Sequence, residues 1–116
     1  MVLTDEGVEM LRDVISSDLS SGQAGTGTIP ARPDQTALSQ AVSATLNALS
    51  TNIKSSNTIN MTHVVTTAEA NGSTLSEWEI LGSSDTVNYN RLVLSGLLKN
   101  SQTEITMIQV FALERI

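Results

Sequence analysis

The chain has no cysteine among its 116 residues, which excludes a disulfide framework, a thiol nucleophile and thiolate metal ligands. Aromatic residues are scarce, with one Phe, one Tyr and one Trp, so the core must consist mostly of aliphatic side chains and methionine. A core of this kind predicts marginal stability unless a partner covers part of it, and we therefore expect oligomerisation.

Basic residues and long apolar runs are also lacking. Six Lys and Arg residues are scattered among twelve acids, and the net charge of −6 argues against a nucleic-acid partner. No apolar run approaches a membrane span, and no basic start followed by an apolar core marks a secretion signal. We expect a single soluble domain over residues 1–116, rich in Ser, Thr, Asn and Gln as many viral all-β proteins are.

The front of the chain predicts one helix and one loop. Thr4 or Asp5 can cap a helix over about residues 5–16, whose apolar residues recur at helical spacing. Residues 17–35 hold three glycines and two prolines, which forbid a continuous helix and predict a surface crossing, an edge strand or a binding loop. The run Gly25-Thr-Gly-Thr lacks the lysine and third glycine of a phosphate-binding loop, so we expect no nucleotide site.

Residues 36–49 are ambiguous between helix and strand. Helical spacing favours a second helix through about Val42, whereas the β-branched residues that follow make a strand possible. The residues that recur at helical spacing are Leu38, Ala41, Val42, Thr45, Leu46 and Leu49.

The rest of the chain predicts four strands, over residues 58–67, 74–81, 87–94 with an extension to Leu98, and 103–115. Asn71-Gly72 predicts a hairpin tip between the first two, because both residues tolerate positive φ. The last strand should be the longest, and because it is apolar on both faces we expect it to be central or covered by the N-terminal helix. The predicted fold class is mainly β (α+β): an antiparallel β-sandwich with one or two N-terminal helices.

Glu77, Trp78 and Glu79 alternate along the second predicted strand, which places the tryptophan toward the core and both acids on the other face. Paired acids suggest acid–base chemistry or a metal site, but an exposed acidic face that pairs with Arg91 or Lys99 is the simpler interpretation. Arg91 lies within an apolar strand, so we expect a partly buried stem and a paired head, with Glu77 as the first partner.

The sequence indicates no catalytic, cofactor-binding or metal-ligating residue, and we expect a protein that is not an enzyme. His63 is the only histidine and no nucleophile motif such as Gly-x-Ser-x-Gly accompanies it, which favours a structural or solvent-facing role. The candidates for structural or interface roles are Asn71, Gly72, Glu77, Trp78 and Arg91.

Several stretches together resemble a family of small tail, baseplate and fibre-attachment proteins from tailed viruses of bacteria and archaea. After a leading helix they are Gly25-Thr-Gly-Thr-Ile-Pro-Ala-Arg-Pro-Asp-Gln-Thr-Ala-Leu, Glu69-Ala-Asn-Gly-Ser-Thr-Leu-Ser-Glu-Trp-Glu-Ile-Leu, Arg91-Leu-Val-Leu with Lys99, and the final long strand. Two departures are Glu79, where the family has glycine, and the weak strand Ser21-Gly-Gln-Ala before the glycine–threonine run.

The resemblance implies a virion location in a tail, collar or baseplate. It implies an attachment or assembly module that binds other virion proteins and copies of itself, as a trimer or ring. A capsid decoration or turret protein is the alternative. A receptor- or carbohydrate-binding module is another, in which Trp78 and Tyr89 would be the platforms for sugar stacking.

Overall fold

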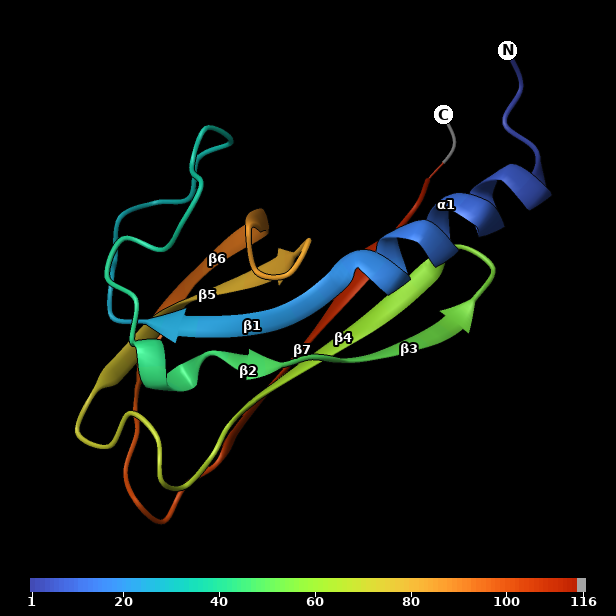
Figure 1. Ribbon diagram of the computed structural model, residues 1–116. Coiled ribbons are helices and arrows are strands. Elements are labelled where there is room, and N and C mark those ends of the chain that lie inside the picture. The colour runs from blue at the N-terminus through green and yellow to red at the C-terminus, as the bar shows by residue number, and fades with distance from the viewer. Residues whose placement is uncertain (115–116) are drawn as a thin grey trace.

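The computed structural model describes residues 1–114, which form one α-helix, one short 3₁₀ helix and seven strands in two antiparallel sheets (Figure 1). The order of strands is β2-β1-β5-β6 in sheet A and β3-β4-β7 in sheet B. The predicted mainly β sandwich with a helix at its front is confirmed. The elements are α1 (Asp5–Asp18), β1 (Leu19–Gly25), η1 (Ser43–Thr45), β2 (Asn47–Ala48), β3 (Ser50–Ser55), β4 (Thr58–Val65), β5 (Thr74–Gly82), β6 (Val87–Leu98) and β7 (Ile105–Ala112).

Helix α1 begins where its cap predicts, because the Thr4 hydroxyl accepts the N–H of Gly7 at 3.2 Å. It ends two residues later than predicted and passes into β1 without a loop, since Leu19 already has extended backbone angles. Val8 is buried and Ile15 packs on the core, while Met10 and other apolar residues of α1 stay exposed. The helix therefore packs against the core through one narrow apolar stripe that includes Val8 and Ile15.

The core lies between the two sheets in two neighbouring clusters. Trp78 is 1% exposed and packs with small and aliphatic residues of both sheets, so its predicted core position is confirmed. Its burial contributes up to about 4–6 kcal/mol by transfer of its surface from water. The buried residues are Ala24, Val65, Leu75 and Trp78 in the first cluster and Ile59, Met61 and Ile80 in the second.

The prediction of a loop over residues 17–35 is wrong for its first part, because β1 lies inside sheet A between β2 and β5. Gly22 allows close packing of this strand and does not form a turn. A Cβ on Gly22 would lie 2.7 Å from ring atoms of His63, so only glycine lets the strand approach sheet B this closely. Residues 26–42 are the true loop.

The predicted second helix through Val42 is wrong, whereas the strand alternative for the later residues is confirmed by β2 and β3. The only helical turn here is η1. The Thr45 hydroxyl accepts the N–H of Ala24 at 2.8 Å, and this bond ties the turn to the distant strand β1.

The predicted hairpin at Asn71-Gly72 is also wrong, because β4 belongs to sheet B and β5 to sheet A. Residues 66–73 cross between the sheets instead. Gly72 has the expected positive φ of 86°, and its N–H donates to the carbonyl of Lys99 at 2.8 Å. The turn chemistry was recognised, but the two segments it joins do not pair.

Strands β5 and β6 match their predicted ranges, and β6, not β7, is the longest of the described strands. The prediction that β7 is central or covered by the helix is wrong as well. β7 is an edge strand, and Ile108 and Val110 on its outer face are each 59% exposed. Ile15 of α1 and Phe111 of β7 each pack against the core cluster that contains Ile59.

Candidate functional site

Glu77 on β5 is the centre of the polar cluster in which the predicted residues meet. Its carboxylate is fully buried and accepts four hydrogen bonds, so the predicted exposed acidic face is wrong. The donors are Arg91 Nε (2.8 Å) and Ser39 N (2.9 Å) to Oε1, and Gly27 N (2.7 Å) and Gln40 N (2.9 Å) to Oε2.

The predicted pairing of Glu77 with Arg91 is confirmed. The pair is diagonal, because the residue directly opposite Arg91 in the β5–β6 register is Glu79. The Arg91 side chain is 2% exposed, and its Nη1 donates to Gln35 Oε1 at 3.2 Å. Its Nη2 is buried without a partner among residues 1–114.

The Gly-Thr-Gly-Thr run supplies part of this cradle. A Cβ on Gly27 would overlap both Glu77 Oε2 and Ser39 Oγ, so only glycine fits between them. The carbonyl of Gly27 also accepts the Ser76 hydroxyl at 2.7 Å. One backbone N–H of the run, that of Gly27, therefore binds an anion, and this anion is a carboxylate of the same chain.

The pKa values of the two acids of β5 are shifted in opposite directions. Burial alone would raise the pKa of Glu77, but the hydrogen bonds from Gln40, Ser39, Arg91 and Gly27 outweigh it and leave the pKa below its usual value. Burial raises the pKa of Glu79, and a hydrogen bond from Asn88 Nδ2 at 2.7 Å only partly offsets this.

This arrangement suits a structural clamp better than an acid–base pair. The four hydrogen bonds that the Glu77 carboxylate accepts all come from its own chain, and three of the donors lie in the 26–42 loop. The clamp, formed by Glu77, Arg91 and the backbone N–H groups of Gly27, Ser39 and Gln40, therefore ties the 26–42 loop to the outer face of sheet A. The negative charge of Glu77 is stabilised by Arg91 and by these N–H groups.

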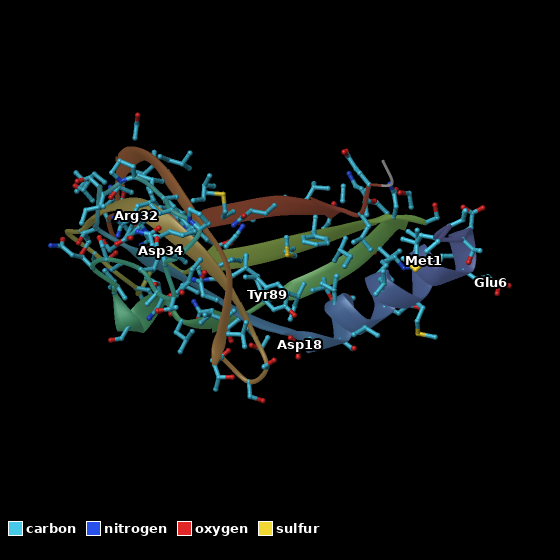
Figure 2. All side chains as sticks on the ribbon, turned by 90° about the horizontal axis from the view of Figure 1, so that it is seen from above. Met1, Glu6, Asp18, Arg32, Asp34 and Tyr89 are labelled. Atoms are coloured by element: carbon cyan, nitrogen blue, oxygen red, sulfur yellow. The ribbon has the colours of Figure 1, made fainter. Side chains whose placement is uncertain are left out.

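A surface pocket of about 340 Å³ lies beside the clamp, between the loop and β6. Arg32 and Asp34 near its rim form an exposed ion pair at 3.6 Å (Figure 2). Figure 2 also shows Tyr89 beside Asp18, to which its hydroxyl donates at 2.5 Å. The pocket is lined by Ala31, Arg32, Pro33, Gln35, Asn88, Tyr89, Asn90 and Arg91.

His63 is buried, which fits the structural interpretation and contradicts the solvent-facing one. Its Nε2–H donates to the carbonyl of Thr45 at 2.8 Å, while Nδ1 has no partner among the described residues. Burial lowers the pKa of His63, so the ring is neutral at pH 7. The histidine joins β4 of sheet B to η1.

Lys99 was missed as a buried residue, and the prediction that it pairs with a glutamate of β5 is wrong. Its side chain is fully buried, and Nζ donates to Asn71 Oδ1 and to the carbonyl of Asn100, each at 2.8 Å. Asn71 therefore contributes through its amide oxygen and not through a hairpin. Nothing in the local sequence indicates that a lysine at the end of a predicted strand is buried, because its partner Asn71 lies in the segment 66–73 that crosses between the sheets.

Among residues 1–114, no group of three or more His, Cys, Asp and Glu residues is placed to hold a metal ion. The helix in that range is too short and too polar to cross a membrane. Comparison with protein-family models, with curated proteins and with solved structures finds no match to this chain.

Proposed function

We propose that this chain is a non-enzymatic structural component of a tailed-virus particle, located in its tail, collar or baseplate. In this role it binds copies of itself and neighbouring virion proteins as an attachment or assembly module. The proposal starts from the stretches of sequence that resemble small tail, baseplate and fibre-attachment proteins.

One observation carries the proposal: the separate stretches behind the resemblance meet in a single buried cluster. Gly27 belongs to the first stretch, Glu77 to the second and Arg91 to the third, and they lie within hydrogen-bond distance around one carboxylate. The residues of the resemblance thus build the clamp that ties the 26–42 loop to sheet A, which supports a structural role for them.

The surface of the domain also supports assembly. The molecule is elongated, with extents of 50 × 28 × 24 Å, and α1 extends along one end of it (Figure 1). Large apolar side chains are exposed on α1, at the end of β6 and on β7, among them Met10, Leu98 and Ile108. These exposed apolar side chains are available for contacts with other proteins.

The experiment is to dissociate purified particles of a virus that encodes this chain and to search for the chain by mass spectrometry in intact particles and in purified head and tail fractions. Recovery in the tail fraction is the expected result. Recovery in the head fraction would favour a capsid decoration or turret protein, and absence from intact particles would overturn the virion assignment.

The carbohydrate-binding alternative loses its main platform. Trp78 is buried in the core and cannot stack on a sugar, and the Tyr89 hydroxyl is engaged by Asp18. Binding on a glycan array that disappears in Tyr89→Ala would be needed to support it.

A further inference from the structure

The four edges of the two sheets differ in how well they are protected against pairing with another chain. Edge strands are normally blunted by shortness, charge, proline or a bulge. β2 has two residues, β3 carries Lys54 and a register shift, and β6 carries Arg91 and two register shifts with β5. Each of these three edges therefore has at least one protective feature.

β7 has none of these features. Its eight residues, Ile105–Ala112, contain no charge, proline or glycine, and its register with β4 is unbroken over the whole strand. β4 is its only strand partner among residues 1–114, and Figure 2 shows β7, in red, at the margin of sheet B. A regular, uncharged strand with a free edge is a template for adding another strand.

The outer face of β7 is apolar as well as open. Ile108 and Val110 are each 59% exposed, whereas Met107 and Phe111 on the other face pack on the core. A strand added at this edge gains backbone hydrogen bonds and covers part of these two side chains.

We propose that β7 pairs with β7 of a second copy of this chain, antiparallel about a two-fold axis, to form a continuous six-stranded sheet β3-β4-β7-β7-β4-β3. The inference rests on the proposed self-assembly and identifies its surface. A two-fold contact uses the same edge twice. A trimer or ring built by edge pairing alone would need a second open edge, and the other three edges are protected.

Charge selects the register of this pairing. A two-fold axis perpendicular to the sheet keeps equal faces together, so it passes through either Ile108 or Gln109 at the middle of the strand. An axis at Gln109 sets Glu104 directly opposite Glu114 of the second copy, and like charges in that position are destabilising. An axis at Ile108 sets Glu104 opposite Ala112, so Ile108 faces its own counterpart.

The chain contains no cysteine, so single-cysteine variants report this register directly. Ile108→Cys and Val110→Cys replace equally exposed residues. With the axis at Ile108, the two thiols introduced at position 108 are directly opposite, whereas thiols at position 110 are displaced by four residues, roughly 13 Å, which is too far for a disulfide. Under copper phenanthroline oxidation we expect a covalent dimer of I108C and none of V110C.

A charge variant tests the same surface without cross-linking. Ile108→Lys sets two lysines opposite each other and should raise the dimer dissociation constant by at least about tenfold in sedimentation velocity. Ile29→Lys, at a 55% exposed position of the 26–42 loop, is the matched control and should leave the constant unchanged. Circular dichroism of each variant checks the fold, and the cysteine pair decides the question if the lysine variant does not fold.

The contrary outcomes are distinct. If the chain forms oligomers but I108C does not cross-link and I108K keeps the oligomer, the β7 pairing is wrong while the proposed self-assembly survives. Cross-linking only in a mixture of I108C and V110C would overturn the register in favour of an axis at Gln109. A monomer at all concentrations up to about 100 μM would overturn both proposals.

Discussion

Replacing Glu77 with glutamine removes the charge that faces Arg91 and keeps the size of the side chain. Arg91 then remains buried without a counter-ion, since its other observed partner is the neutral amide of Gln35. The glutamine also directs an NH₂ group at backbone N–H donors of the 26–42 loop, where the carboxylate had an acceptor.

The loss of stability follows from the burial of both partners, which are 0% and 2% exposed. Breaking a buried ion pair by removing one partner costs about 3–5 kcal/mol. A domain of this size has about 5–15 kcal/mol of total stability, and each kcal/mol corresponds to roughly 4 °C. We expect Glu77→Gln to lower the melting temperature by roughly 12–20 °C.

Two measurements test this expectation. Thermal unfolding can be followed by the fluorescence of Trp78, the only tryptophan, which is buried in the folded state. Hydrogen exchange reports the amides of Gly27, Ser39 and Gln40, which lose their acceptor in the variant and should exchange faster than the core strands.

Asp34→Asn is the matched control, because it removes the acid of the exposed pair Arg32–Asp34 and should cost less than about 1 kcal/mol. The double variant Glu77→Gln/Arg91→Met should be more stable than Glu77→Gln alone, since it removes the unpaired charge. A loss below about 1 kcal/mol in Glu77→Gln, with unchanged loop exchange, would refute the clamp.

Three further predictions concern buried contacts of His63, Gly22 and Thr45. Burial lowers the pKa of His63 in the folded state, so as pH falls below about 6.5 the histidine of the unfolded chain is protonated first. The free energy of unfolding should therefore decrease with falling pH until the lower pKa of the folded state is reached. When unfolding is measured as a function of pH, this decrease should be absent from His63→Asn. Gly22→Ala should cost about 1–3 kcal/mol in denaturant unfolding, because its Cβ would lie 2.7 Å from the His63 ring; an unchanged midpoint would contradict this packing. Thr45→Val keeps the shape of the side chain but removes the acceptor of the buried Ala24 N–H. Thermal unfolding should show that the free energy of unfolding falls by about 1–3 kcal/mol. An unchanged stability would contradict this role of the hydroxyl.

The pairing of Glu77 with Arg91 was predictable because an arginine inside an apolar strand needs a nearby acid. The rest of the clamp was not. Gly27 and Ser39 reach the carboxylate only because the 26–42 loop folds back over sheet A, and no local pattern encodes that path. Lys99 was missed for the same reason, since its acceptor Asn71 lies 28 positions away.

Local sequence patterns were sufficient to predict α1 and the alternating strands. Capping at Thr4 and the period of the apolar residues depend on neighbours within a few positions, so these elements could be placed without the fold. The composition likewise required an aliphatic core around one tryptophan, and Trp78 lies there.

Which strands are neighbours depends on the packing of the whole chain. Leu19–Gly25 became an interior strand because its small residues fit against His63 and between two other strands, and β4 and β5 were separated into different sheets. β7 became an open edge although it is apolar on both faces. Strand order depends on contacts between distant segments and on the space between sheets, and neither is present in the local pattern of residues.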